Sequence, residues 1–329
     1  MNDMTPPARS SRLAAQFSDP DITLEGEARA QVPFQQLETL WFNTGSLCNI
    51  ECEHCYILSS PTNDALSYLR FDEFTPFLDE IETLGLTPRE IAFTGGEPFM
   101  NPDMILMAET ALARGFEVLI LTNAMAPMMR PTVQTGLLSL NDRFGDRLSL
   151  RISLDHYSAE QHDLERGAGS FEKSRQGLGW LQTHGFCFSI AGRSLWGEEE
   201  PTARAGFQAL FDNEGWALDA DNLDHLVIFP EMDEQADVPE ITSRCWDVLG
   251  LAPSSLMCAS SRMVVKRKGA ASPQVLPCTL LPYLPDFEMG ATLAQSLSVD
   301  GGMFDKGAVK LCHVHCAKFC VLGGGSCSS

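Results

Sequence analysis

The sequence has no long apolar run and few basic residues. No stretch of its 329 residues approaches the ~20 consecutive apolar residues that a membrane-spanning helix requires. Lysine and arginine together number 23, against 44 aspartate and glutamate residues, so the formal net charge is −21. A chain this acidic is not expected to bind nucleic acid non-specifically or to sit on an anionic membrane.

An apolar segment is also missing near the N-terminus. The first 31 residues are polar and contain Pro6, Pro7 and Pro20, so they lack the apolar core of a secretory signal. We therefore expect a cytoplasmic protein whose 11 cysteines are reduced and available to metal ions. Cys187 and Cys245 stand alone in the sequence and fit buried single thiols.

Three cysteines are spaced closely, as C-x3-C-x2-C, at Cys48, Cys52 and Cys55. Three thiolates on one loop can hold three irons of a 4Fe–4S cluster, which leaves the fourth iron open for chemistry. A zinc site normally needs a fourth ligand, and His54 is a poor candidate because adjacent residues rarely reach one ion together. A disulfide would require an oxidising compartment.

Apolar runs alternate with amphipathic stretches between residues 37 and 230, which predicts parallel βαβ units. The expected strands are 40–42, 90–93, 117–121, 148–154, 186–191 and 226–229. The expected helices are 72–84, 104–114, 132–140, 171–182 and 202–211. Six units are too few for a closed eightfold barrel. The predicted organisation is a polar, weakly ordered arm over 1–35, an α/β domain over 36–238 and a smaller cysteine-rich domain over 239–329.

Polar residues follow the ends of these strands, where barrels of this kind carry their chemistry. They are Thr94, Gly95, Gly96, Glu97, Asn123, Ser153, Asp155, Arg166, Arg193, Glu231 and Asp233. Each also has a structural interpretation: a Gly-Gly turn, a polar turn, a salt bridge or, for Glu231 and Asp233, a solvated acidic loop. As functional groups, Glu231 and Asp233 are the candidates for substrate binding or proton transfer. Arg193, together with Arg262, Lys266 and Arg267, hints at an anionic substrate.

A second set of cysteines occupies the C-terminal region. Cys258 and Cys278 flank a predicted hairpin that turns at 268–269. The others are Cys312, Cys316, Cys320 and Cys327. Six thiolates fall short of two complete four-cysteine clusters, so one fully ligated 4Fe–4S cluster is favoured over two. A structural zinc site remains an alternative, although the spacing C-x3-C-x3-C is unusual for zinc.

The first cysteine loop, followed about 40 residues later by Gly95-Gly96-Glu97, resembles the radical S-adenosylmethionine (radical SAM) superfamily, and the C-terminal cysteines resemble its SPASM and twitch extensions. The resemblance implies a partial (β/α)6 TIM-like barrel with a smaller auxiliary-cluster domain. It implies a 4Fe–4S cluster that binds SAM, and one auxiliary 4Fe–4S cluster or two. The residues that it places at SAM are Tyr56, Thr94, Gly95, Gly96, Glu97, Asn123, Ser153, Asp155, Arg166 and Arg193.

The function implied by the resemblance is an enzyme that cleaves SAM to a 5′-deoxyadenosyl radical, which abstracts hydrogen from a substrate. The reductant is expected to be a flavodoxin or ferredoxin. The substrate is a small molecule or a peptide, including the precursor peptide of a peptide maturase, and the net reaction is an oxidation if an auxiliary cluster accepts an electron. The alternative is a non-catalytic iron–sulfur carrier or sensor, which would need no SAM pocket.

Overall fold

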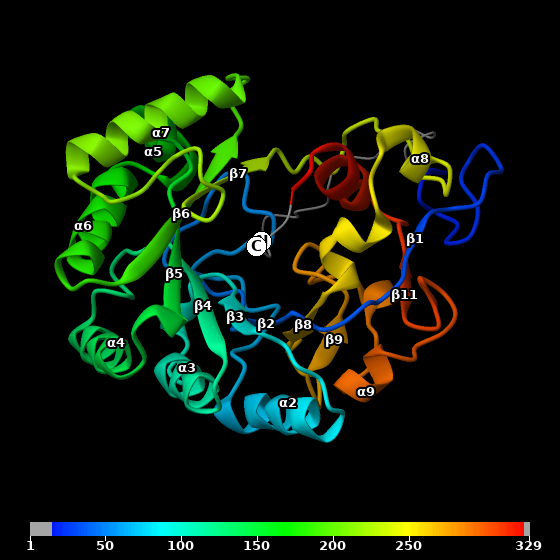
Figure 1. Ribbon diagram of the computed structural model, residues 1–329, viewed down its shortest axis with the longest axis horizontal. Coiled ribbons are helices and arrows are strands. Elements are labelled where there is room, and N and C mark those ends of the chain that lie inside the picture. Colours follow the sequence, from blue (N-terminus) through cyan, green and yellow to red (C-terminus); the bar gives the residue numbers. More distant parts are fainter. Residues whose placement is uncertain (1–14, 326–329) are drawn as a thin grey trace.

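The computed structural model describes residues 15–325, and its centre is one eight-stranded sheet (Figure 1). Neighbouring strands follow the order β7-β6-β5-β4-β3-β2-β8-β9. Every pair is parallel except β8 with β9. The strands are β2 (Thr39–Asn43), β3 (Glu90–Thr94), β4 (Glu117–Thr122), β5 (Leu148–Ser153), β6 (Cys187–Ser194), β7 (Leu226–Pro230), β8 (Ser261–Val265) and β9 (Gln274–Leu276).

Helices connect the parallel strands and lie along the outer side of the curved sheet (Figure 1). On α2 the buried residues are Phe74, Phe77, Leu78 and Ile81, the spacing of one helical face. Strands β2 and β3 are buried along their whole length, as expected for parallel strands covered on both faces. The helices are α2 (Phe71–Thr83), α3 (Met104–Ala113), α4 (Pro131–Phe144), α5 (Ala159–Arg166), α6 (Ser170–Thr183) and α7 (Glu200–Glu214).

The sheet is an open, partial barrel, which confirms the predicted fold class. Its edges are β7 and β9, and within residues 15–325 no strand pairing closes one edge on the other. All six predicted strands are present, as β2 to β7, and the predicted hairpin is the antiparallel pair β8–β9. Because β8 pairs with β2, the sheet continues past residue 238. The domain boundary at that position stays a prediction.

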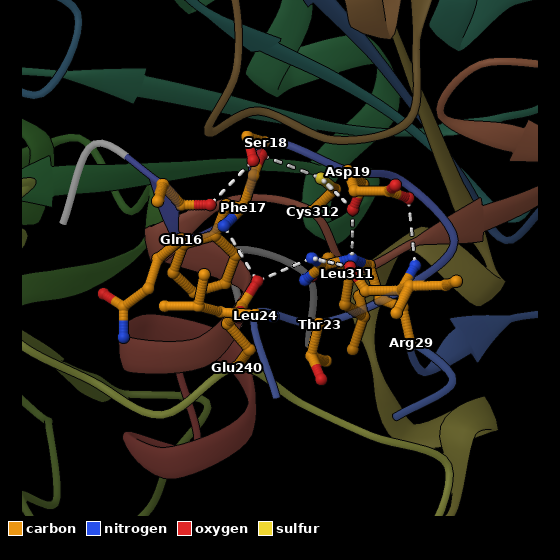
Figure 2. Close-up of polar contacts among 12 residues, drawn as sticks. Gln16, Phe17, Ser18, Asp19, Thr23, Leu24, Arg29, Glu240, Leu311 and Cys312 are labelled. Carbon is orange, nitrogen blue, oxygen red and sulfur yellow. Dashed lines mark hydrogen bonds and ion pairs between the residues drawn. The ribbon is translucent and has the colours of Figure 1, made fainter. Parts of the chain in front are cut away.

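Residues 15–35 are tied to the C-terminal part of the chain, a degree of order that the sequence did not indicate. Strand β1 (Gln31–Val32) pairs with β11 (Ala308–Lys310), which also pairs with β10 (Phe304–Asp305). Arg29 and Glu240 form a buried ion pair with Nη2 and Oε1 2.6 Å apart (Figure 2). Two short helices, α8 (Cys245–Leu249) and α9 (Leu293–Ser296), and a π-helix over Cys316–Leu322 complete this region.

The lone cysteines differ from their prediction. Cys187 is exposed and Cys245 is partly exposed, because they begin β6 and α8 at positions that face outward. The helices of residues 15–325 include none with the length and apolar character needed to cross a bilayer.

Candidate active site

The segments that follow the carboxyl ends of β2 to β7 converge on one cavity. Its empty volume, including its open mouth, is ≈ 1020 Å³. Most residues that the sequence predicted for the SAM site line it: Cys48, Cys52, Cys55, Tyr56, Thr94, Gly95, Gly96, Asn123, Ser153, Asp155, Arg166 and Arg193. Residues from six separate strand ends are thus brought together at the predicted edge of the sheet.

The loop that carries Cys48, Cys52 and Cys55 is irregular, and its thiols are largely buried. Burial raises the pKa of Cys48 to about 12 and that of Cys52 to about 11, so both thiols are protonated at neutral pH. In the part of the chain that the structure describes, no three His, Cys, Asp or Glu side chains are gathered closely enough to hold one metal ion. The three thiols therefore line one cavity, but they are not gathered around a single point.

Two glycines let the end of β3 pack against the backbone of the cysteine loop. Gly95 has a φ of +146°, and a Cβ there would lie 2.7 Å from the carbonyl oxygen of Gly45. A Cβ on Gly96 would lie 2.3 Å from the carbonyl oxygen of Leu47. The amide of Gly96 donates to the Gly45 carbonyl over 2.8 Å. Any side chain at either position would push the loop away from β3.

Glu97 is the predicted SAM contact that does not line the cavity. Its carboxylate is buried and accepts three hydrogen bonds: from the Phe99 amide at 3.2 Å, the Thr122 hydroxyl at 2.8 Å and the Asn123 amide at 2.9 Å. Burial raises the pKa of Glu97 to about 7 despite these donors. In this arrangement Glu97 joins the ends of β3 and β4, and its predicted contact with SAM stays a prediction.

Asp155 and Arg166 form a buried bidentate ion pair in the cavity wall. Arg166 Nε and Nη2 donate to the two oxygens of Asp155 over 2.6 and 2.8 Å. Burial alone would raise the pKa of Asp155, but Arg166 and, more weakly, Arg193 outweigh it, so the pKa lies below its usual value. The pair joins the end of β5 to the last residue of α5.

Glu165 was not singled out from the sequence, yet it connects the cysteine loop to the barrel. One carboxylate oxygen accepts from the His54 amide at 2.8 Å and from Arg193 Nη1 at 2.9 Å, and the other lies 2.7 Å from His54 Nδ1. The Glu165 carbonyl also accepts from the Glu53 amide at 3.0 Å. His54 is therefore bonded to a carboxylate, and nothing in its local sequence revealed this partner.

The basic residues that hinted at an anionic substrate are engaged elsewhere. Arg193 pairs with Glu165, Lys266 pairs with Glu73 at 2.6 Å, and Arg267 pairs with Glu288. Arg262 is buried away from the cavity. None of the four is an unpaired cation in the cavity wall, so the charge pattern gives no support to an anionic substrate.

Glu231 and Asp233, the candidates for proton transfer, lie outside the cavity lining. Glu231 is exposed and reaches Lys318 at 3.2 Å, whereas Asp233 caps its own loop through the Gln235 amide at 2.8 Å. Their apolar neighbours enter the wall instead: Phe229, Pro230, Met232, Leu280 and Phe319. The rings of Phe229 and Phe319 are 5.9 Å apart, so β7 and the π-helix meet at an apolar side of the cavity.

Four C-terminal cysteines line a second, smaller cavity of ≈ 370 Å³ empty volume: Cys258, Cys278, Cys316 and Cys320. Cys258 and Cys278 lie just before β8 and just after β9, and the other two lie on the π-helix. Leu280 lines both this cavity and the larger one.

Cys312 is not among the residues that line this cavity. Its thiol donates to the carbonyl oxygens of Phe17 at 3.0 Å and Asp19 at 3.4 Å, in the segment that precedes β1 (Figure 2). Burial raises its pKa to about 11. The sixth cysteine of the predicted set, Cys327, lies outside the described residues.

Comparison with known protein families agrees with this geometry. The family described as the radical SAM superfamily matches residues 42–192, which run from β2 into β6 and include the cysteine loop and the two glycines. Residues 42–192 therefore form a radical SAM domain.

Curated relatives of this chain cover it in part. The antilisterial bacteriocin subtilosin biosynthesis protein AlbA of Bacillus subtilis is 29% identical over 181 residues, 55% of this chain and 37% of its own length. An AdoMet-dependent heme synthase of Methanosarcina barkeri is 31% identical over 44% of this chain and 38% of its own length. The mycofactocin maturase MftC of Mycobacterium tuberculosis is 32% identical over 42% and 33%. The matches thus span 33–38% of the length of these relatives.

Solved radical SAM structures share the fold at low sequence identity. Streptococcus suis SuiB bound to S-adenosylmethionine superposes with a TM-score of 0.56 and 9% identity over 78% of this chain and 63% of its own. Native anSMEcpe with bound AdoMet gives 0.55 and 15% identity over 80% of each chain. These likenesses cover more of the chain than residues 42–192, and they concern the fold alone.

Proposed function

We propose that the chain is an enzyme that cleaves SAM reductively and removes a hydrogen atom from a peptide. The observation that carries this proposal is the single cavity in which Cys48, Cys52 and Cys55 lie beside the two glycines and the Asp155–Arg166 pair. Three thiols fit a 4Fe–4S cluster with one open iron. The remaining space fits a second ligand next to it.

Side chains of the cavity would bind the cluster and SAM. Cys48, Cys52 and Cys55 are the proposed ligands, and each must lose its proton when the cluster is loaded. When bound, the cluster supplies the electron that splits SAM into methionine and a 5′-deoxyadenosyl radical. Gly95 and Gly96 bring the end of β3 close to the loop. Around them, Tyr56, Thr94, Asn123, Ser153, Arg166 and Arg193 are the proposed contacts of SAM.

A peptide substrate is favoured by the relatives and is compatible with the cavity wall. AlbA takes part in bacteriocin biosynthesis, MftC is a maturase, and SuiB has been solved bound to the precursor peptide SuiA. The wall formed by Phe229, Met232, Leu280 and Phe319 suits an apolar side chain.

We assign the auxiliary 4Fe–4S cluster to Cys258, Cys278, Cys316 and Cys320, because these four thiols line one cavity. This is a complete ligand set for one cluster. Cys312, bonded to two backbone carbonyls, is left out of it. One auxiliary cluster is therefore proposed, in a cavity that shares Leu280 with the larger one.

Anaerobic reconstitution tests the enzyme. With a chemical reductant, or a flavodoxin or ferredoxin, and with SAM, the protein should release 5′-deoxyadenosine, and Cys52→Ala should release none. An intact first cluster that releases no 5′-deoxyadenosine would instead indicate a carrier or sensor. Deuterated candidate peptides should pass deuterium to the 5′-deoxyadenosine. Turnover that draws deuterium only from a small molecule would refute the peptide assignment.

Iron analysis tests the cluster assignment. One auxiliary cluster predicts about eight irons per chain and two predict about twelve. Cys320→Ser should lose about half of the iron, whereas Cys312→Ser, its matched control, should keep about eight. Loss of a whole cluster in Cys312→Ser would overturn the ligand set.

A further inference from the structure

Arg262 is a fully buried cation on β8 that has no carboxylate partner among the described residues. Its Nη1 donates to the carbonyl oxygens of Cys258 at 2.9 Å and Ser261 at 2.7 Å, and Nη2 donates to that of Gly307 at 3.5 Å. Its Nε is buried without a partner. The guanidinium carbon lies 4.3 Å from the centre of the Phe34 ring.

A buried charge is costly unless an opposite charge lies close to it. Other arginines with little exposure lie near a carboxylate: Arg29 is paired with Glu240, Arg166 is paired with Asp155, and the charge of Arg151 acts on Glu90. Arg262 has only carbonyl dipoles and an aromatic face, and burial lowers its pKa to about 10. The charge of Arg262 is therefore not balanced by a carboxylate among the described residues.

The charged groups that would oppose it are thiols. Arg262 Nη1 donates to the Cys258 backbone carbonyl over 2.9 Å, so the guanidinium lies directly beside a residue of the four-cysteine cavity, which Cys278 also lines. A 4Fe–4S cluster bound by four thiolates carries two negative charges when oxidised and three when reduced. Such a cluster would supply the missing counter-charge. The positive charge of Arg262 would stabilise the reduced cluster more than the oxidised one.

We propose that Arg262 is the built-in counter-charge of the auxiliary cluster and raises that cluster's reduction potential. The inference rests on the proposed auxiliary cluster at Cys258, Cys278, Cys316 and Cys320. Because net charge near a cluster is one of the factors that set its potential, an unpaired cation in a dry site has a large effect. Arg166 is different: it is neutralised by Asp155, so its effect on the Cys48/Cys52/Cys55 centre is smaller. The structure thus places an unpaired cation near the auxiliary centre and a neutral ion pair near the Cys48/Cys52/Cys55 centre.

The test is a redox titration, followed by electron paramagnetic resonance, of full-length protein in which Cys48, Cys52 and Cys55 are all replaced by alanine. This background should retain about four irons per chain, all in the auxiliary cluster. Arg262→Met should lower the equilibrium constant for one-electron reduction at least tenfold, which is about 59 mV toward more negative potential. Arg262→Lys, which keeps the charge, should remain within threefold of the parent. So should Arg267→Gln, which removes a hairpin arginine already paired with Glu288.

An Arg262→Met protein that keeps its iron and titrates within threefold of the parent overturns the inference. Arg262→Gln provides a second neutral variant with the same readout if the methionine variant does not fold. Absence of iron from the triple-alanine background would refute the auxiliary cluster itself, and with it the role of Arg262. If Arg262→Met retains its iron and its potential is unchanged, the auxiliary-cluster assignment stands and only the proposed role of Arg262 is refuted.

Discussion

Replacing Asp155 by asparagine should destabilise the fold strongly, because it leaves Arg166 buried without its anion. The two side chains are 1% and 12% exposed and meet through two short hydrogen bonds. Removing one partner of a buried ion pair typically costs about 3–5 kcal/mol. The amide nitrogen of asparagine would also face a guanidinium donor. For a chain of 329 residues the loss should lower the melting temperature by about 4–7 °C.

The assay is urea unfolding of the metal-free protein at pH 7, following the transition of the barrel, for Asp155→Asn, Arg166→Met and the double variant. Since each single change leaves the charge of the other residue buried without its partner, the double variant should cost less than the sum of the two by about 1–3 kcal/mol. Single-variant losses below about 1 kcal/mol, or strictly additive losses, would refute the reasoning.

The pH dependence of the same variant gives an independent check. The pKa of Asp155 is lower in the folded protein than its usual value, so the ion pair stabilises the fold above the unfolded pKa of about 3.9. That stabilisation is lost as the pH falls through the folded pKa. The difference between parent and Asp155→Asn should therefore be constant from pH 5 to 8 and shrink in more acidic solution. A difference that grows on acidification would contradict the assignment.

Three further predictions concern the neighbouring residues. Glu97→Gln should reduce the free energy of unfolding by about 1–3 kcal/mol, since the amide cannot accept from every donor around it. The parent should lose stability as the pH rises from about 4.5 through 7, because Glu97 ionises there while buried, and the variant should lack this contribution. Urea midpoints across that pH range measure both effects, and SAM affinity measured in parallel tests the predicted contact. Glu165→Gln should weaken the hydrogen bonds to His54 and speed the loss of iron to a chelator. An unchanged rate of iron loss would show that these hydrogen bonds do not hold the cysteine loop in place. Gly96→Ala should cost at least about 1–3 kcal/mol in thermal unfolding, because its Cβ would meet the Leu47 carbonyl at 2.3 Å, and a neutral effect would show that the loop can yield.

The elements of the barrel could be predicted because their signals are local. Each strand from β2 to β7 is a short apolar run, and each long helix repeats its apolar residues with helical spacing. The strand-end residues followed from the fold, since parallel strands present their carboxyl ends on one side. That is why side chains as distant in sequence as Cys48 and Arg193 were expected together and line one cavity.

The errors and omissions concern pairings between distant segments, which leave no local pattern. Glu231 and Asp233 are acidic residues beside a strand end, but the side chains that turn into the cavity are their apolar neighbours Phe229 and Met232. Glu165 resembles any acidic residue of an exposed helix until the fold brings it to His54. The spacing of the C-terminal cysteines could not separate Cys312 from the others, because its thiol is oriented by the segment near Phe17.

The position of Leu280 links the two cavities physically. Its side chain lines the space that contains Cys48, Cys52 and Cys55 and also the space that contains Cys258 and Cys316. Phe319, one residue before Cys320, likewise enters the larger cavity and packs near Phe229. The C-terminal region therefore forms part of the active-site wall, because β8 and the π-helix bring it against the open side of the barrel. A substitution at Leu280 should therefore change the lining of both cavities at once.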